Sequence, residues 1–394
     1  MHPQAASRRR PVAAWRAPPV PGRSGGGHED ATLEALARRI ARLRGSEYAG
    51  AYDASEAPPR NAYLVPEATL LRSQVAGLDV HAPADLFGGV VPHRFVATKL
   101  ISHPAARPDA RVPRGWEPAL AGRLAQAVLP GFSVFDAADA LAAFDRLSSL
   151  GPVRFKLARG IGGNGQQRIA ARAELEEALH ALPDGELERH GASLEQDLRD
   201  AVTFSIGVVE CAGQRMAYHG RQRTVTTPQG HEAYAGSTLD VVCGGLDDLV
   251  GRLSSTNARD PAQGDPADSA LLRAVRQARR YDVEMQRAFP GFFASRRNYD
   301  VVSGLDAAGE RRSGVLEQSW RLGGASPAEL LAMEAFAANP AVVRVRAACH
   351  EIHGECTPPP GAIVHYDGHD PRLGKLVKYA ILESVEERVH GHAA

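Results

Sequence analysis

Hydrophobic residues along the chain switch between two spacings, one typical of helices and one typical of strands. Apolar positions recur at helical spacing from residue 31 to residue 43, and short apolar runs at 62–66 and 88–92 follow as predicted strands. Further helices are predicted over 118–129, 137–147, 173–182, 269–289 and 327–338, and further strands over 153–157, 167–170, 194–198 and 203–210. At 394 residues, this mixture predicts an α/β protein of two or three domains.

Three segments depart from this pattern. The first 28 or so residues are rich in Arg, Pro, Ala and Gly and lack the apolar stretch of a signal peptide, so residues 1–30 are predicted to be a disordered tail. Residues 254–268 are rich in Ser, Asp, Pro and Gly, which predicts an exposed loop. Lys375 and Lys378 fall in a helical pattern near the C-terminus and are interpreted as surface charges.

The balance of charge limits the classes of partner. The chain has 46 acidic and 46 basic residues, and its net charge of zero removes the usual electrostatic argument for a nucleic-acid partner. No apolar run reaches the roughly 18 residues that suggest a membrane span. Four cysteines are too few for a disulfide scaffold in a chain of this size, so we expect a cytoplasmic protein.

The chain keeps only four lysines among its 46 basic residues, and two of them lie where a nucleotide-binding enzyme needs them. Lys156 stands on a predicted strand just before a glycine-rich loop, and Lys99 ends the segment His-Arg-Phe-Val-Ala-Thr-Lys. A lysine ammonium is a compact, mobile charge that suits a phosphate oxygen, whereas arginine is a planar fork. We therefore predict that Lys156 binds phosphate. For Lys99, taken alone, phosphate binding and an ordinary charge are equally open.

The loop after Lys156 contains Gly160, Gly162, Gly163 and Gly165, which fit the pattern G-x-G-x-x-G. In a dinucleotide-binding Rossmann unit, this pattern opens directly into a helix whose N-terminus holds the pyrophosphate. Here a strand-like sequence follows, so a hairpin flap with a glycine tip is the preferred interpretation. Such a flap can bring backbone N–H groups onto phosphates. A flexible surface hairpin is the structural alternative.

A second predicted hairpin carries acidic side chains. Its turn sets a register in which Asp300 lies opposite Val315 and diagonal to Glu317. Ser319 and Arg321 follow on the same face as Glu317. Two carboxylates so placed can clamp one or two magnesium ions, which take oxygen ligands at ~2.0–2.1 Å. The alternative is a solvated hairpin with surface charges, but its apolar neighbours favour an interior strand.

Two further groups of residues offer chemistry but also have ordinary explanations. Arg221 and Arg223 follow a predicted strand and suit a substrate carboxylate, although a surface hairpin explains them equally well. The other group, in which every member is a possible zinc ligand, consists of Cys349, His350, His353 and Cys356. Its spacing is not that of a familiar zinc finger, so a polar, partly buried segment is preferred.

Taken together, the order of these parts resembles the ATP-grasp superfamily, which includes D-alanine–D-alanine ligase, glutathione synthetase and biotin carboxylase. The resemblance covers roughly residues 61–382 and is closest to a bacterial branch of that superfamily. It implies an α+β ATP-grasp fold, in which two α/β subdomains clasp ATP behind a small α/β pre-ATP-grasp domain. The implied boundaries are 31–98 for the pre-ATP-grasp domain, 99–190 for the subdomain with the flap and 191–394 for the subdomain with the metal site.

The resemblance also implies roles for individual residues. The family's hinge pattern, apolar-Glu-x-x-Leu, holds the adenine and matches 194–198. The nucleotide-binding residues so implied are Lys99, Lys156, Gly160, Gly162, Gly163, Gly165, Glu195, Gln196 and Leu198. The magnesium ligands so implied are Asp300, Glu317 and Ser319. The catalytic cations so implied are Lys156 and Arg321.

Three positions depart from the superfamily pattern. Ser319 stands where a metal-binding asparagine is usual. Val202 stands where an acidic residue usually binds the ribose, and Asp197 or Asp200 is the expected substitute. Asn298 occupies the place of an arginine in the peptide-ligase branch.

The activity that the resemblance implies is ATP- and magnesium-dependent ligation. A small-molecule carboxylate becomes an acyl phosphate, which an amine or similar nucleophile then attacks. The alternatives are an ATP-grasp small-molecule kinase, a non-catalytic ATP-binding protein and a Rossmann-type oxidoreductase. The expected cofactors are ATP and Mg²⁺, and neither a nucleic acid nor a membrane is an expected partner.

Overall fold

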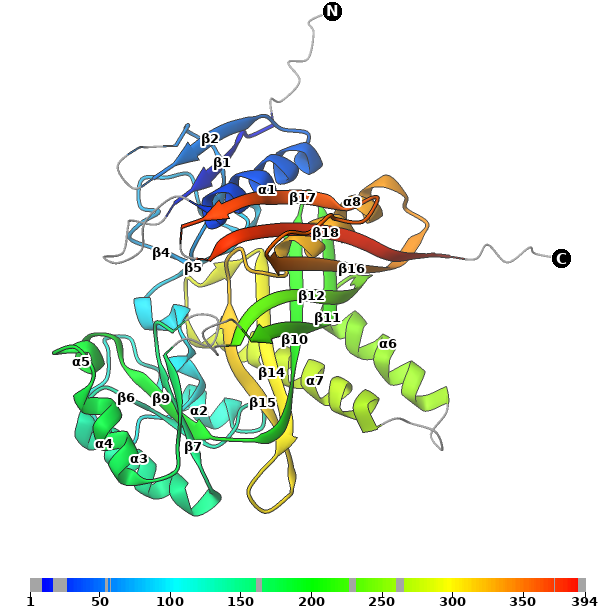
Figure 1. The fold of residues 1–394 in the computed structure, drawn as a ribbon. Coiled ribbons are helices and arrows are strands. Elements are labelled where there is room, and N and C mark those ends of the chain that lie inside the picture. Colours follow the sequence, from blue (N-terminus) through cyan, green and yellow to red (C-terminus); the bar gives the residue numbers. More distant parts are fainter. Residues whose placement is uncertain are drawn as a thin grey trace, which may run out of the picture.

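The computed structural model describes residues 9–16, 27–53, 56, 58–160, 165–226, 232–259, 266–371 and 373–388 (Figure 1). Within these residues the helices are α1 (His28–Arg44), α2 (Pro118–Leu124), α3 (Ala137–Leu147), α4 (Arg172–His180), α5 (Glu186–His190), α6 (Leu246–Arg259), α7 (Pro266–Ala288) and α8 (Ser326–Ala338). The 3₁₀ turns are η1 (Pro83–Asp85), η2 (Arg94–Ala97), η3 (Lys99–Ser102) and η4 (Ser148–Leu150).

The strands in the first half of the chain are β1 (Val12–Trp15), β2 (Tyr48–Tyr52), β3 (Tyr63–Pro66), β4 (Leu70–Leu71), β5 (Gly89–Val91), β6 (Gly131–Val134), β7 (Val153–Leu157), β8 (Gln166–Ile169) and β9 (Ala192–Gln196). Those in the second half are β10 (Arg199–Cys211), β11 (Gln214–Thr226), β12 (Glu232–Cys243), β13 (Phe293–Ala294), β14 (Arg296–Leu305), β15 (Arg311–Ser319), β16 (Val342–His353), β17 (Ile363–Asp370) and β18 (Gly374–Glu387). This mixture confirms the predicted α+β class.

The N-terminal unit is a three-stranded parallel sheet in the order β2-β1-β3, packed against α1 (Figure 1). Its central strand, β1, is buried along its whole length. The prediction of a disordered tail over 1–30 is therefore wrong for this segment. The four small or apolar residues of β1 are buried because β2 and β3, which come later in the chain, pair with it on both sides. The sequence around β1 does not reveal those partner strands.

A four-stranded antiparallel sheet, in the order β6-β9-β7-β8, has one apolar and one polar face. Phe155 and Leu194 are buried in a core that includes residues of α3 and α4. Side chains alternate along a strand, so Lys156, Ser193 and Glu195 lie on the opposite face. The small sheet therefore presents a polar surface to the rest of the molecule.

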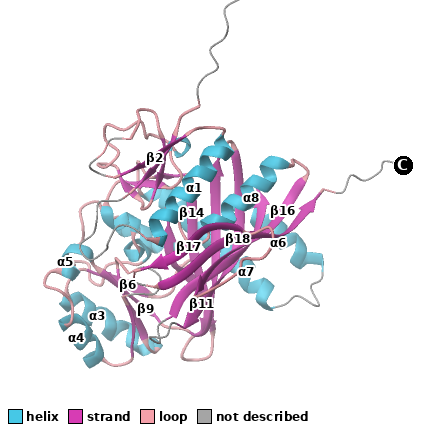
Figure 2. Cartoon of the chain, turned by 45° about the horizontal axis from the view of Figure 1, so that its top comes forward, coloured by secondary structure: helices cyan, strands magenta, loops and turns pink. Residues whose placement is uncertain are grey.

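An eight-stranded antiparallel sheet, in the order β15-β14-β10-β11-β12-β16-β18-β17, forms the centre of the protein (Figure 2). Apolar residues of α1 and α8 pack on one face, and those of α6 and α7 pack on the other. β9 and β10 are consecutive, so Asp197 and Leu198 connect the small sheet to the large one. The turn η3 contacts β6, β9 and β15, and therefore touches both sheets.

Two sequence predictions on the large sheet and its helices are wrong. The loop predicted over 254–268 is shorter, because α6 continues to Arg259 and α7 already begins at Pro266. Proline is favoured at the first position of a helix, where its missing N–H would have no partner in any case. The helical pattern around Lys375 and Lys378 is in fact β18, and Lys378 is buried. None of the described helices is both long and apolar enough to span a bilayer.

Candidate functional site

Lys99 lies where the two sheets and the glycine-rich segment meet. Its side chain is 4% exposed, and its Nζ is 2.9 Å from Glu317 Oε2 on β15. The same Nζ donates to the carbonyl oxygen of Gly160, at the start of the glycine-rich segment, at 3.4 Å. Three segments that are far apart in the sequence thus converge on one ammonium group. The burial excludes an ordinary surface charge.

The glycine-rich segment joins the two strands of a hairpin. β7 and β8 pair in antiparallel fashion, and the Leu157 N–H donates to the Gly165 carbonyl oxygen at 2.9 Å. The hairpin interpretation is therefore confirmed. The Rossmann alternative is wrong, because the segment leads into β8 and α4 begins only after that strand. Gly162 and Gly163 lie outside the described residues.

Lys156 is part of a buried triad with Glu195 and His103. Its Nζ contacts Glu195 Oε1, and His103 Nε2 lies 3.1 Å from Glu195 Oε2. Burial raises the pKa of Glu195, but Lys156 and His103 outweigh that effect and hold the pKa at about 2. Glu195 is therefore charged at neutral pH, and in the ligand-free protein it neutralises Lys156.

The predicted hinge offers polar atoms that the protein itself does not satisfy. Gln196 ends β9 and is buried, and Leu198 is half-buried just before β10. Ser193 Oγ, Gln196 Oε1 and His103 Nδ1 are buried and lack a hydrogen-bond partner within the described part of the chain. Buried polar atoms left in this state are costly, and a bound polar ligand or water usually satisfies them. Ser193 lies on the face of the small sheet that carries Lys156, and His103 contacts Glu195 on that face, whereas Gln196 follows on the opposite face with Leu194. Two of the three polar atoms are therefore on the side of Lys156.

The acidic hairpin is formed by β14 and β15, but its register differs from the prediction. Asp300 lies directly opposite Glu317, while Val301 faces Val315. The predicted pairing of Asp300 with Val315 is wrong, because Leu316 is an extra residue on β15 and forms a β-bulge. Directly opposed residues have Cβ atoms roughly 4.5–5.5 Å apart, so the two carboxylates are closer than a diagonal pair.

The chemistry of this pair suits a divalent cation. Gln222 Nε2 on β11 lies 3.0 and 3.1 Å from the two oxygens of Asp300. Burial and the charge of Glu317 raise the pKa of Asp300 to about 7. A cation between the carboxylates relieves this repulsion, and oxygen ligands are those that Mg²⁺ prefers.

The hydroxyl of Ser319 follows on the same face. No set of three His, Cys, Asp or Glu side chains gathers at one point in the described ranges, so a metal here takes part of its coordination from another source, such as water or a substrate.

A buried network supports the end of this hairpin. Arg296 pairs with Glu329 of α8 at 2.7 Å and donates to the carbonyl oxygen of Arg321 at 2.7 Å. Asn298, which replaces the arginine of the peptide-ligase branch, donates from Nδ2 to Ser205 Oγ at 2.7 Å. The buried guanidinium of Arg296 therefore fixes the backbone at Arg321, whose own side chain is half-buried.

The place of the ribose-binding acid is not filled by Asp197. Arg154 and Arg168 pair with its carboxylate at 2.6 and 3.2 Å. Val202 is exposed, and Asp200 lies exposed beside an irregularity of β10 with a φ of 49°. Asp200 is therefore the more accessible of the two acids that were predicted as substitutes for a ribose ligand.

Arg221 and Arg223 lie away from the acidic pair. They alternate along β11 with Gln222, which contacts Asp300, so they belong to the opposite face of the sheet. Arg223 instead donates to His350 Nδ1 at 2.7 Å. The prediction that the two arginines bind a substrate carboxylate at this site is therefore not supported.

The four possible zinc ligands do not form a site. Cys349 is buried, and its Sγ donates to the Gly324 carbonyl oxygen at 3.0 Å. His350 follows on the other face of β16, where it stacks on Tyr379 with ring centroids 4.6 Å apart. Residues that are adjacent on a strand point to opposite faces, so these two cannot share a metal ion. The structure thus agrees with the interpretation as a polar, partly buried segment.

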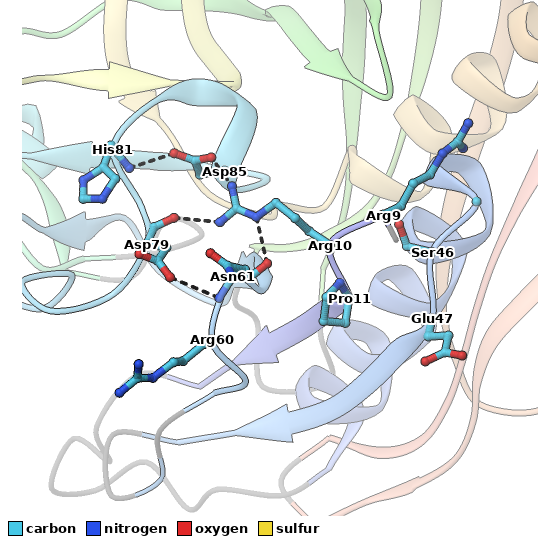
Figure 3. Close-up of a pocket in the computed structure, with 11 residues that line it drawn as sticks. Arg9, Arg10, Pro11, Ser46, Glu47, Arg60, Asn61, Asp79, His81 and Asp85 are labelled. Carbon is cyan, nitrogen blue, oxygen red and sulfur yellow. Dashed lines mark hydrogen bonds and ion pairs between the residues drawn. The ribbon is translucent and has the colours of Figure 1, made fainter. Parts of the chain in front are cut away.

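A separate cavity of about 800 Å³ lies in the N-terminal unit, and Figure 3 shows the residues that line it. None of them belongs to the predicted nucleotide site. Arg10 forms an ion pair with Asp85 and donates from Nε to the Asn61 carbonyl oxygen at 2.8 Å. Protein groups therefore already engage the guanidinium of Arg10.

Sequence reasoning missed His103, Gln222 and Gln318. His103 contacts Glu195, which lies 92 residues further along the chain, so no local spacing marked it. Gln222 contacts Asp300 because of the register of β11 in the large sheet. Gln318 contacts the turn before Lys99 because β15 is the edge strand of that sheet. No local motif marks either residue.

Three solved structures are similar to this chain in fold, each at low sequence identity. D-alanyl-alanine synthetase A from Vibrio cholerae is 10% identical, with a TM-score of 0.43, and the match covers 84% of this chain and 99% of that one. Phosphoribosylamine–glycine ligase from Thermotoga maritima is 13% identical, with a TM-score of 0.45 and coverage of 96% and 93%. A RimK domain ATP-grasp protein from Sphaerobacter thermophilus is 13% identical, with a TM-score of 0.38 and coverage of 83% and 96%.

Among curated proteins no match is found. A family model described as "Protein of unknown function (DUF3182)" matches residues 21–380. The two sheets that carry the flap hairpin and the acidic hairpin meet at η3.

Proposed function

The chain belongs to the DUF3182 family of proteins of unknown function, and we propose that it is an ATP- and Mg²⁺-dependent ligase with an ATP-grasp site. The observation that carries the proposal is the position of Lys99. Its ammonium lies between the glycine-rich flap and the acidic hairpin, in contact with Gly160 and Glu317. A cation enclosed by a flap and a carboxylate pair is the arrangement that phosphoryl transfer needs, because catalysis there is mostly positioning and charge stabilisation.

The hinge supports a place for the nucleotide base. Ser193 and His103, both on the Lys156 side of the small sheet, each leave a buried polar atom without a partner among the described residues. Adenine has a donor and acceptors on its edge, so it would satisfy atoms of this kind. Lys156 lies opposite Ser193 in the small sheet, which would put the phosphates next to the base-binding hinge.

The acidic hairpin supports a place for magnesium. Asp300 and Glu317 would hold the ion, with Ser319 as a third oxygen donor, and the bound ion would neutralise charge on the phosphate oxygens. Glu317 is also the counter-charge of Lys99, so metal binding would release that lysine toward the phosphates. The backbone of Arg321, held by Arg296, would place one more cation at the end of the hairpin.

The proposed reaction has two steps. A substrate carboxylate attacks the γ-phosphorus of ATP, which forms an acyl phosphate and releases ADP. An amine or similar nucleophile then attacks the acyl carbon and releases phosphate. Lys99 and Lys156 would stabilise the charge on the transferred phosphoryl group, and no covalent protein nucleophile is required.

The test is titration calorimetry of Mg-ATP binding to the parent and to Lys156→Ala, with Lys375→Ala as the control. Lys375 is a lysine on the exposed side of β18 that pairs with Asp367 at 2.6 Å. We expect the first variant to lose Mg-ATP binding and the control to bind like the parent. Equal binding by all three proteins would show that Lys156 is not in the site.

The chemistry is tested separately, with hydroxylamine added to the protein, Mg-ATP and pools of small carboxylic acids. A ligase that forms an acyl phosphate gives a hydroxamate together with ADP. A kinase gives a stable phosphorylated product without hydroxamate, and a non-catalytic binder gives no ADP. Ser319 and Val202 replace a metal ligand and a ribose ligand of the superfamily. For this reason a non-catalytic ATP-binding protein is the main alternative that this assay tests.

A further inference from the structure

The turn that carries Lys99 is tied to the edge of the large sheet by Gln318, the neighbour of Glu317 on β15. Gln318 Nε2 donates to the carbonyl oxygens of Val96 at 3.1 Å and Thr98 at 2.7 Å. Thr98 immediately precedes Lys99, so one bond ends at the base of the lysine's own turn. Gln318 is buried, and its amide is therefore shielded from competing water.

Tyr281 of α7 holds the other end of the same turn. Its hydroxyl donates to Gln318 Oε1 at 3.1 Å and lies 2.9 Å from the hydroxyl of Ser102, the last residue of η3. Tyr281 is fully buried. A single 3₁₀ turn has little stability of its own, so external anchors decide where it lies. Gln318 and Tyr281 supply anchors at both ends of the turn from Lys99 to Ser102.

β15 thus holds this turn from both of its faces. Side chains alternate along the strand, so Glu317 reaches Lys99 Nζ on one face while Gln318 reaches the backbone on the other. This is possible because β15 is an edge strand of the large sheet and η3 packs against it. A lysine side chain is long and flexible, so the place of its ammonium depends on where the backbone is fixed.

We propose that Gln318, anchored by Tyr281, is a positioning residue that sets the Lys99 ammonium at the phosphate-binding position between Gly160 and Glu317. The inference rests on the proposed nucleotide site and adds a residue that acts on it indirectly. Gln318 touches no phosphate itself, so its whole effect on nucleotide binding passes through Lys99.

A double-mutant cycle tests this dependence. Mg-ATP affinity is measured by calorimetry for the parent, Gln318→Met, Lys99→Met and the double variant. We expect each single change to weaken binding about tenfold, and the double variant to bind within about twofold of Lys99→Met. Independent effects that multiply to about a hundredfold would overturn the proposal.

A matched control separates positioning from loss of stability. Gln277 on α7 is also buried, and its Nε2 donates to the Ser313 and Gln126 carbonyl oxygens at 2.9 and 3.3 Å, but it does not contact the Lys99 turn. We expect Gln277→Met to lower the urea midpoint about as much as Gln318→Met and to leave Mg-ATP affinity within about twofold of the parent. Equal loss of affinity in both variants would assign the effect to general destabilisation.

If Gln318→Met does not fold, Tyr281→Phe replaces it in the cycle, because that change removes only a hydroxyl. The same pattern is then expected, with an effect on affinity that disappears in the Lys99→Met background. A parent protein that does not bind Mg-ATP would refute the proposed function itself. A parent that binds, with additive effects of Tyr281→Phe and Lys99→Met, would refute only the positioning role.

Discussion

Asp300→Asn should make the ligand-free protein more stable while it removes magnesium-dependent nucleotide binding. The pKa of Asp300 is raised from 3.8 to about 7, because the half-buried carboxyl is partly desolvated and lies opposite Glu317. A raised pKa means that the native state disfavours the charged form. This carboxyl therefore supports stability fully at pH values below about 4, and that support is lost as the pH rises to about 7. Above pH 7 the parent carries the repulsion, and the amide removes it.

The magnitude follows from the shift. About three pKa units correspond to roughly 4 kcal/mol, and the partial exposure of Asp300 reduces this to on the order of 2 kcal/mol. Urea unfolding of both proteins without metal, at pH 8 and at pH 5, measures the difference. We expect a clear gain for the variant at pH 8 and a smaller one at pH 5. A variant that is less stable than the parent at both pH values would refute this account of the acidic pair.

Two further predictions concern the ion pairs of the buried lysines Lys156 and Lys378. Glu195→Gln should lower the free energy of unfolding by about 3 kcal/mol at neutral pH, because the carboxylate has a pKa of about 2 instead of 4.5. The stabilising contribution of Glu195 is present above about pH 4.5 and is lost as the pH falls to about 2. Adding Lys156→Met to Glu195→Gln should restore part of the stability that the single variant loses, since Lys156 then no longer leaves an unpaired charge. Lys378→Met should cost about 3 kcal/mol, because it strands Glu351, which pairs with Lys378 at 2.8 Å. Lys375→Met, at a partly exposed position of the same strand, should change stability by no more than about 0.5 kcal/mol. Urea titration measures all four variants, and equal costs for the two single lysine changes on β18 would contradict the burial of Lys378.

The parts of the site that the sequence could predict are those that depend on neighbours in the chain. The flap hairpin was predictable because Lys156, the glycines and the returning strand lie within 14 residues, and the strand-like sequence after Gly165 separates a flap from a Rossmann turn. The acidic hairpin was predictable as a hairpin for the same reason. Its register was not, because the bulge at Leu316 follows from packing rather than from the turn.

The parts that the sequence could not predict depend on distant strands. β1 is the centre of a parallel sheet whose other strands come later, so a four-residue apolar run looked like part of a tail. Lys378 looked exposed because apolar residues near it also fit a helical spacing, whereas pairing of β18 with β16 and β17 makes it a buried strand residue. His103 was equally hidden, because its partner Glu195 lies 92 residues away.

The measurement that tests the central claim most directly is the thermal unfolding of the parent protein with ADP, with and without Mg²⁺. A ligand present at about 100 times its dissociation constant adds roughly 2.7 kcal/mol to the free energy of unfolding, which is easily detected. We expect stabilisation by ADP that requires Mg²⁺, because in the proposed site Asp300 and Glu317 would hold the ion next to Lys99. The absence of any shift with ADP or ATP at millimolar concentration would contradict the proposed nucleotide site.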